Sequence, residues 1–429
     1  MSNETIPDDV DVGDISKYQT EKIRVLVGLN GSFDSSVTAF LLKKQGFQVV
    51  GLGIITWDEN DPLKSKLKTP NCHIQNLEGL KNFCESLDIP FYAADAKAQY
   101  ENDVLEFAMT NKVTGRSINS CINCNQLRFE ILYAKMKKLN CHFIATGHYA
   151  KTYKNHQTNE FFIHSANDKA HDQSFLVSGI RQEILKKLLL PLSELKRSEV
   201  DKIAKNFSLT NFAQYKSQLE CFLEDEVFPK YIEKKVPARF RERGNMIDIE
   251  NDSFISDHEG FHHFHIAQKN IKLDGGKKSI DRNLAIVDFN YHDNQILLGK
   301  DEATKTLGVQ VIKVLFSSEV DRTKPLKVFA KMNNSIDFYK ATLYYKNNDT
   351  LYLELEKAYE FLAENHKIVF YDKDAASSRV LGVGYVATRG LYNPTARGDE
   401  FRNHGKKSKN PFEQAKSQEQ DEDEVKLRF

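Results

Sequence analysis

The residues most able to do chemistry are three cysteines in two short segments. Cys121 and Cys124 form a Cys-x-x-Cys pair just before an expected helix, and Cys221 follows far downstream. A helix N-terminus lowers the pKa of a nearby thiol and so favours the reactive thiolate. A single such pair is too few for a four-cysteine zinc site. The three cysteines could instead be reactive thiols or hold three corners of an iron–sulfur cluster.

A second candidate site is an anion-binding loop. The expected strand Ile23–Leu29 runs into the segment Gly28-Leu29-Asn30-Gly31-Ser32-Phe33-Asp34-Ser35-Ser36, and a helix over Ser35–Gln45 follows at once. Small residues let the backbone approach an anion, and a helix N-terminus directs free N–H groups at it. A carboxylate such as Asp34 can hold Mg²⁺ against phosphates. Without a lysine the loop is not a Gly-Lys-Ser/Thr phosphate loop, and the alternative is an ordinary capped turn.

The surrounding elements must place these groups together. Between residues 22 and 207 strand patterns alternate with helical patterns, and the later strands are expected at 47–55, 91–94 and 142–146. This alternation predicts an α/β fold, a Rossmann-like domain with a mostly parallel sheet. In such sheets ligands bind beyond the carboxyl ends of the strands. The loop and the cysteine pair are therefore expected at that edge.

Downstream the pattern changes to many short strands, which predicts a small antiparallel barrel or sandwich. We expect a disordered acidic extension over 1–20 and a disordered charged tail over 393–429, because both are polar with few apolar residues. The expected domains are the α/β domain at 21–218, a small central domain at 219–282 and a C-terminal antiparallel β-barrel at 283–392.

Composition sets the broad class. The 429 residues are 40% hydrophobic and 28% charged with zero net charge, which allows two or three domains. No apolar run approaches the roughly 20 residues that span a bilayer. The N-terminus does not have the pattern of a secretory signal, so we expect a cytoplasmic protein with reduced cysteines. A basic cluster at 227–244 is either a local RNA contact or a solvated helix face.

Together these features resemble the tRNA-specific 2-thiouridylases, over about residues 23–390. The loop is similar to the Ser-Gly-Gly-x-Asp-Ser-Ser loop of the ATP pyrophosphatases, with Asn30 for the first Ser and Ser32 for the second Gly. The other matching motifs follow the family's order and nearly its spacing: Gly115–Asn125, Ala145–Lys151, Asp168–Leu176, Cys221–Phe222, Asp257–Gly260, Ile266–Gln268, Val369–Tyr371 and Leu381–Gly384.

The resemblance implies an enzyme that uses ATP with Mg²⁺ to adenylate the O2 of the wobble uridine of tRNA, and then replaces that oxygen with sulfur. Cys221 would carry a persulfide received from a sulfur-relay protein or a cysteine desulfurase. Cys124 would release sulfide by forming a disulfide with Cys221, or would attack directly. The residues implied for ATP are Gly28, Leu29, Asn30, Gly31, Ser32, Phe33, Asp34, Ser35, Ile54 and Gly147.

The resemblance also implies the RNA contacts of a monomeric enzyme. Asn119, Ser120 and Cys121 would contact the flipped target base. His171, Asp172 and Gln173 would contact tRNA elsewhere. The chain is identified as a divergent member, and two alternatives stay open. One is an iron–sulfur-dependent thiolase that uses all three cysteines, and the other is a catalytically weakened tRNA-binding paralogue.

Overall fold

The computed structural model describes residues 20–58, 60, 72–207, 209, 227–273, 278–316, 320–346, 350–360 and 362–389. Cys221 lies outside the described residues, as do residues 1–19 of the expected acidic extension and the whole expected tail at 393–429.

The N-terminal part is built on a parallel sheet in the order β3-β2-β1-β4-β7. The prediction of a Rossmann-like domain is confirmed. Strand order reverses on either side of β1, so the crevice outside the carboxyl ends of β1 and β4 is the expected ligand position. The strands are β1 (Arg24–Leu29), β2 (Gln48–Ile55), β3 (Phe91–Asp95), β4 (Phe143–Ala145) and β7 (Leu188–Leu189).

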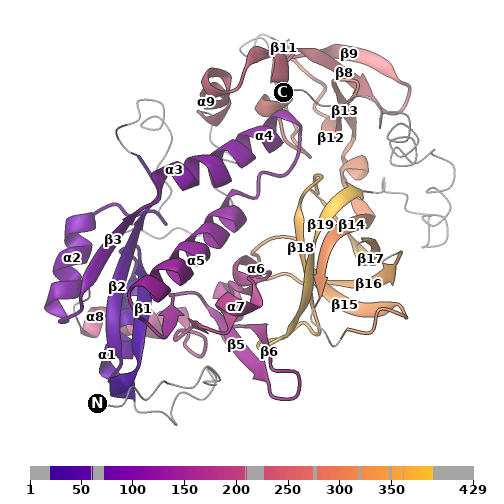
Figure 1. Cartoon of the computed structure of the whole chain (residues 1–429). Coiled ribbons are helices and arrows are strands. Elements are labelled where there is room, and N and C mark those ends of the chain that lie inside the picture. Colours follow the sequence, from indigo (N-terminus) through magenta and orange to yellow (C-terminus); the bar gives the residue numbers. More distant parts are fainter. Residues whose placement is uncertain are drawn as a thin grey trace, which may run out of the picture.

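Helices cover this sheet and carry the candidate residues to its edge (Figure 1). Helix α1 starts directly after the loop that follows β1, because Ser32 caps it by accepting a hydrogen bond from Ser35 N. Helix α5 starts at Ser120 and packs on β1 and β4. A π-helical stretch, Glu101–Glu106, joins α3 to α4. The helices are α1 (Phe33–Lys44), α2 (Leu77–Ser86), α3 (Lys97–Tyr100), α4 (Phe107–Val113), α5 (Ser120–Lys138) and α8 (Arg197–Asn206).

An antiparallel hairpin, not expected from the sequence, follows β4. Its strands β5 (Ala150–Asn155) and β6 (Glu160–Ser165) pair with each other, and β6 contacts the barrel strand β19 (Val380–Arg389). The short helices α6 (Ser174–Val177) and α7 (Gln182–Leu185) follow. Together the hairpin and these helices connect the α/β domain to the barrel.

The central region forms a four-stranded sheet in the order β12-β13-β8-β9. This corrects the expected start of the barrel at 283. Strand β13 pairs in parallel with β8, so residues 284–300 bury Ile296 and Leu298 against Met246 in the central core rather than in the barrel. The strands are β8 (Gly244–Asp248), β9 (Ser253–His258), β12 (Leu284–Asn290) and β13 (Gln295–Lys300).

Helix α9 (Phe228–Lys235) carries the first half of the basic cluster and is followed by a short 3-10 turn. Several of the cationic groups have intramolecular partners. Lys235 pairs with Glu101, and Arg243 pairs with Glu259. Arg241 donates to two carbonyl oxygens of α9 and its C-cap. These contacts favour a structural reading of the cluster.

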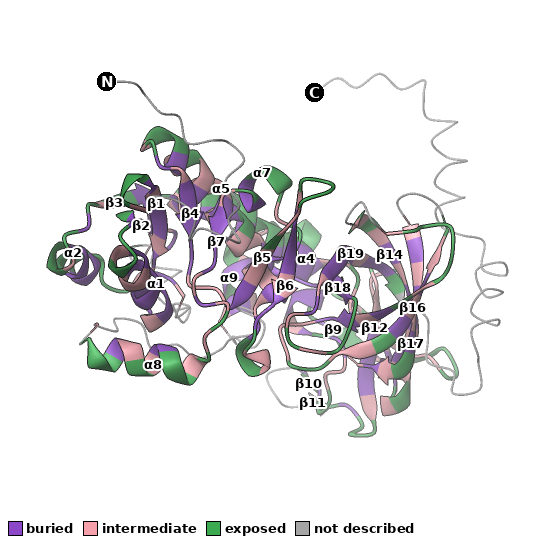
Figure 2. Cartoon of the chain, turned by 90° about the horizontal axis from the view of Figure 1, so that it is seen from below, coloured by how far each residue is buried: buried purple, intermediate pink, exposed green. Residues whose placement is uncertain are grey.

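The C-terminal part closes into a six-stranded antiparallel barrel, as expected. Alternating residues such as Val309, Val311 and Leu353 fill its interior, and Figure 2 shows the buried positions along the strands. Tyr371 and Val383 instead join the core of the α/β domain. The strands are β14 (Thr306–Phe316), β15 (Leu326–Lys331), β16 (Tyr339–Tyr345), β17 (Thr350–Tyr359), β18 (Lys367–Tyr371) and β19.

Among the helices of the described part of the chain, none combines the length and the apolar character that crossing a bilayer requires.

Candidate active site

The loop after β1 is organised around the side chain of Asn30. Its Oδ1 atom accepts hydrogen bonds from Ser32 N at 3.2 Å, Ser32 Oγ at 2.9 Å and Ser35 Oγ at 2.9 Å. Its Nδ2 atom donates to the carbonyl oxygen of Cys72 at 3.3 Å. The two residues that depart from the usual pyrophosphatase loop thus bond to each other, and the N–H of Ser32 is already satisfied.

The carboxylate of Asp34 is buried at the start of α1 and held by two side chains. Tyr149 donates its hydroxyl to Oδ1 at 2.8 Å, and Arg197 of α8 lies 3.2 Å from Oδ2. Burial raises the pKa of Asp34, while Arg197 and the hydrogen bond from Tyr149 oppose that rise. The arrangement orients an oxygen-rich group beside the loop, which suits a hard cation such as Mg²⁺.

Gly147 lies directly against this loop. A Cβ atom at this position would lie 2.6 Å from the backbone carbon of Asp34 and 2.9 Å from Ser35 N. Only glycine allows the two segments to approach so closely. The segment after β4 therefore closes one side of the crevice beyond β1.

A short polar relay links the segment after β4 to α5. His148 Nε2 lies 3.1 Å from Asn125 Oδ1, and His148 Nδ1 lies 2.9 Å from Thr146 Oγ1. Because an amide oxygen only accepts, Nε2 carries the proton and Nδ1 accepts from the threonine hydroxyl. Burial and the nearby Arg128 lower the pKa of His148 to about 4, so the ring is neutral at pH 7.

Cys124 lies in the first turns of α5, is 5% exposed and lines the same cavity. Burial raises the pKa of its thiol to about 12, and the cation of Arg128 opposes the rise. The expectation of a lowered pKa for this thiol is wrong, because desolvation outweighs the helix terminus. Arg128 also donates to the carbonyl oxygen of Cys72 at 3.2 Å, which holds its guanidinium at the cavity wall.

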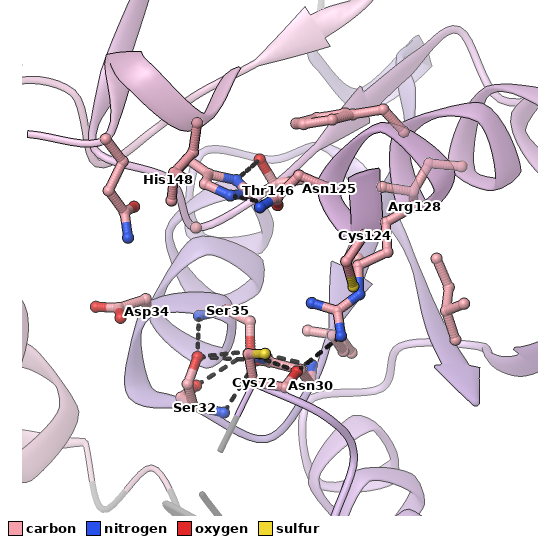
Figure 3. Close-up of a pocket in the computed structure, with 18 of the residues that line it drawn as sticks. Asn30, Ser32, Asp34, Ser35, Cys72, Cys124, Asn125, Arg128, Thr146 and His148 are labelled. Carbon is pink, nitrogen blue, oxygen red and sulfur yellow. Dashed lines mark hydrogen bonds between the residues drawn. The ribbon is translucent and has the colours of Figure 1, made fainter. Parts of the chain in front are cut away.

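These groups surround one cavity of about 170 Å³ at the carboxyl edge of the sheet. In Figure 3, Ser32 and Ser35 lie at one end of the view, Thr146 and His148 at the other, and Cys124 with Arg128 on a third side. The sequence-predicted residues that line the cavity are Gly28, Leu29, Asn30, Ser32, Asp34, Ser35, Ile54, Gly147, Cys121, Cys124 and Gln173.

Some predicted residues lie apart from the cavity lining, and some lining residues were not predicted. Gly31 and Phe33 belong to the loop but do not line the cavity. Asn125, Arg128, Thr146 and His148 line it, and Arg197 reaches Asp34 from α8. The Ala-Thr-Gly-His-Tyr motif and the residues after Cys124 were the available signals for most of these. Nothing in the sequence pattern around Arg197 pointed to Asp34, 163 positions away.

The predicted base-contact residues Asn119 and Ser120 are buried at the start of α5. Asn119 has a positive φ of 47° and donates from Nδ2 to the carbonyl oxygen of Asn365 at 2.5 Å. Ser117 N likewise donates to the carbonyl oxygen of Glu364. The approach to α5 is thus anchored against the segment before the barrel strand β18, whereas Cys121 faces the cavity.

The three predicted tRNA contacts have different surroundings. His171 is exposed and pairs with Asp168. Gln173 faces the cavity and accepts a hydrogen bond from Tyr149 N. Asp172 is buried, pairs with Lys331 at 2.9 Å and accepts from Ser174 Oγ. The carboxylate of Asp172 is therefore engaged inside the protein, and its contact with tRNA stays a prediction.

The described cysteines do not form a metal site by themselves. Within the described residues, the one group of three possible ligand side chains within 4.8 Å of one another is Glu233, His262 and His263, in the central region. For ATP the fit is better. The cavity is lined by Ser32, Ser35 and Asp34 at the N-terminus of α1, an arrangement of hydroxyls, N–H groups and a carboxylate that suits a phosphate and its cation.

Comparison with known proteins places this geometry in context. Residues 23–225 match the family model described as the tRNA methyl transferase HUP domain. The chain is 28% identical to the tRNA-specific 2-thiouridylase MnmA of Clostridioides difficile, over 82% of this chain and 95% of the relative. It is 29% identical to tRNA-specific 2-thiouridylase MnmA 2 of Thermoanaerobacter sp., over 85% of this chain and 97% of the relative.

Among solved structures, a 4-thiouridine synthetase–RNA complex with bound ATP aligns at a TM-score of 0.29 and 12% identity, over 50% of each chain. That score is too low to bear on this chain. The match to the relatives runs through the α/β domain, the central sheet and the barrel, because it covers more than four-fifths of the chain. The chain is thus similar to tRNA-specific 2-thiouridylases over more than four-fifths of its length, and residues 23–225 match the HUP-domain family model.

Proposed function

We propose that the protein is a tRNA-uridine 2-sulfurtransferase, which uses ATP to replace O2 of the wobble uridine of tRNA with sulfur. The observation that carries the proposal is the shared cavity. The phosphate-loop residues Ser32 and Ser35 and the thiol of Cys124 line the same space beyond β1 and β4. An activated uridine and an attacking sulfur would have to meet in such a space.

The first step would be activation of the base. The uridine O2 attacks the α-phosphorus of ATP, a C2–O–AMP bond forms and pyrophosphate leaves. The chain contributes the loop hydroxyls, the N-terminus of α1 and the carboxylate of Asp34, which would hold the Mg²⁺ of MgATP. The neutral His148 and the cation Arg128 line the far side, where Arg128 offsets negative charge.

The second step would transfer sulfur. In one route a thiolate of Cys124 attacks the inner sulfur of a persulfide on Cys221, hydrosulfide leaves and then displaces AMP from C2. In the other route, the outer persulfide sulfur attacks C2 and AMP leaves. The thiolate of Cys124 then attacks the sulfur of Cys221, which breaks its bond to the transferred sulfur and releases the 2-thiouridine. Both routes end with a Cys124–Cys221 disulfide, which a cellular dithiol must reduce. Cys221 lies outside the described residues, so its approach to Cys124 is part of the proposal.

Arg128 has a specific place in this scheme. With a thiol pKa of about 12, Cys124 is protonated at neutral pH in the present arrangement. The cation of Arg128 lowers this pKa, so it would stabilise the thiolate during transfer. Burial of the thiol would also protect it from indiscriminate oxidation before substrate binds.

The remaining assignments follow the family pattern. Asn119, Ser120 and Cys121 would contact the flipped base, and His171, Asp172 and Gln173 would contact tRNA. The sulfur donor would be a sulfur-relay protein or a cysteine desulfurase, and the enzyme would work as a cytoplasmic monomer. Exposed cations would supply affinity for tRNA that weakens steeply with salt.

Complementation of cells that lack wobble 2-thiouridine tests the proposal, with mass spectrometry of their tRNA nucleosides. The chain should restore 2-thiouridine, and Cys124→Ser and Cys221→Ser should each abolish it. Cys84→Ser is the matched control, because Cys84 is buried in α2 away from the cavity. Full thiolation by both active-site variants would overturn the mechanism.

A second candidate is a tRNA-binding paralogue with little catalysis. The observation that favours it is the internal bonding of Asn30 to Ser32 and Ser35, which engages groups that ATP would use. Purified chain with tRNA and ATP distinguishes the two functions. The enzyme releases AMP and forms 2-thiouridine when a sulfide source is present, whereas the paralogue binds tRNA and releases no AMP.

A further inference from the structure

A group of metal-type ligands lies in the central region, away from the cavity that the proposed function uses. Glu233 belongs to α9, and His262 and His263 belong to the 3-10 helix η7 (Phe261–His263). Oε1 of Glu233 lies 3.2 Å from Nε2 of His263 and 3.6 Å from Nε2 of His262. Ligand atoms at about 2.1 Å from a tetrahedral ion are separated by about 3.4 Å. Both distances from the Glu233 oxygen are close to that spacing, and all three ligand atoms lie within 4.8 Å of one another.

The burial of His262 also points to a bound ligand, independently of the spacing of the three side chains. Its side chain is 1% exposed, and neither ring nitrogen has a hydrogen-bond partner among the described residues. A buried imidazole without partners is costly, and a bound ion is one of the ways in which native proteins account for such a group. The ring is aimed at the carboxylate of Glu233, which lies just beyond hydrogen-bonding distance.

The backbone is shaped to admit this ring. Gly260 has a φ of 109°, and a Cβ atom there would lie 2.6 Å from Cε1 and 2.7 Å from Nδ1 of His262. Only a glycine leaves room for the imidazole at this place. The other two ligands reach solvent, since Glu233 is 39% exposed and His263 is 27% exposed, so an ion has an entry path.

The surrounding charges are mixed. Lys112 and Arg241 are the nearby cations, and each is already engaged. Lys112 donates to the carbonyl oxygen of Phe264, and Arg241 donates to the carbonyl oxygens of Glu233 and Val236. Glu259 adds negative charge near His263. Burial and the neighbouring His263 lower the pKa of His262 to about 3, so its ring is neutral at physiological pH, the form that ligates metals.

We propose that Glu233, His262 and His263 bind a divalent first-row transition ion of the zinc type. Two imidazoles and one carboxylate leave a fourth position for water, as in open zinc sites. The ion would join α9 to η7, and η7 in turn packs on α4. This inference is independent of the proposed sulfur transfer, because none of the three ligands lines the cavity of the candidate active site.

Metal binding by the purified full-length chain, free of any affinity tag, tests the site. The chelator-treated protein is titrated with Zn²⁺ against a chromophoric competitor, and then with Co²⁺ followed by visible absorption. We expect one ion per chain with the visible spectrum of nitrogen and oxygen ligation and without a thiolate charge-transfer band. That band would assign the ion to cysteines and overturn the proposal.

The variants His262→Ala, His263→Ala and Glu233→Gln should each weaken Zn²⁺ binding by at least about tenfold, since even outer-shell changes usually cost that much. His265→Ala is the matched control, because His265 is an exposed histidine just after η7. His263→Ala and Glu233→Gln change partly exposed side chains, so they still test the site if His262→Ala fails to fold. Unchanged affinity in both of them would refute the site.

Discussion

The Nζ atom of Lys331 lies 2.9 Å from Oδ2 of Asp172, and the two side chains are 0% and 2% exposed although 159 positions separate them. Lys331 ends barrel strand β15, whereas Asp172 precedes Gln173 of the candidate active site. Gln173 accepts from Tyr149 N, and the Tyr149 hydroxyl donates to Asp34. The ion pair thus connects the barrel to the carboxylate at the start of α1.

Loss of one partner of this pair should destabilise the protein strongly. Lys331→Met leaves a buried, uncompensated carboxylate, and we expect the free energy of unfolding to fall by about 3–5 kcal/mol. Urea unfolding followed by tryptophan fluorescence and circular dichroism measures the change. The exposed pair of Lys169 and Asp374 provides the control, and Lys169→Met should cost less than about 1 kcal/mol.

The double variant Lys331→Met/Asp172→Leu should recover part of that loss, because it removes both buried charges. If the double variant lost as much unfolding free energy as Lys331→Met and Asp172→Leu lose together, the two charges would not interact across the domains.

Removal of the Tyr149 hydroxyl should shift the pH dependence of AMP formation. The Asp34 carboxyl must be ionised to hold Mg²⁺, so activity falls as the pH drops through its pKa. The hydrogen bond from Tyr149 lowers that pKa against burial. In Tyr149→Phe the pKa rises further, and the acidic limb of kcat/KM should move up by about one pH unit.

Tyr153→Phe is the control for that shift, because Tyr153 is 54% exposed on the β5–β6 hairpin. An acidic limb that stays in place in Tyr149→Phe would show that Asp34 does not titrate in the ATP step.

The raised pKa of Cys124 predicts slow alkylation at neutral pH. Only the thiolate reacts, so the rate of iodoacetamide labelling should rise about tenfold per pH unit from 7 to 9 without levelling off. Arg128→Met removes the opposing cation, raises the pKa further and should slow labelling at every pH. Peptide mass spectrometry gives the rate at this residue.

The exposed Lys138 at the end of α5 gives the matched charge control, and Lys138→Met should leave the labelling of Cys124 unchanged. A rate that levels off below pH 9 would contradict the raised pKa.

The hydrogen bonds of Asn30 to Ser32 and Ser35 predict that ATP affinity increases when residues 30 and 32 are changed to the Ser and Gly of the usual pyrophosphatase loop. Asn30→Ser/Ser32→Gly frees the N–H of residue 32 from Asn30. One hydrogen bond is worth about 1 kcal/mol, so the Kd for MgATP should fall by roughly threefold to tenfold. Isothermal titration calorimetry measures it. Asn155→Ser at the end of β5 is the control, and weaker binding by the double variant would refute the argument.

The sequence by itself determined the parallel sheet, the barrel and the position of the loop between β1 and α1. Alternating apolar patterns are local, so the strand ending at Leu29 and the helix after Ser32 follow from their own residues. The motifs of the relatives then predicted that residues such as Gly147 and Cys124, far apart in the chain, belong to one site. The cavity brings these two residues together.

Tertiary structure decided what depends on burial and on distant partners. The same thiol that a helix terminus alone would acidify has a raised pKa, because the fold removes Cys124 from water. Asp172 became the partner of Lys331, and the strands of residues 284–300 joined the central sheet, through contacts with residues remote in sequence. Desolvation and strand pairing are properties of the packed chain, and the sequence near each residue does not contain them.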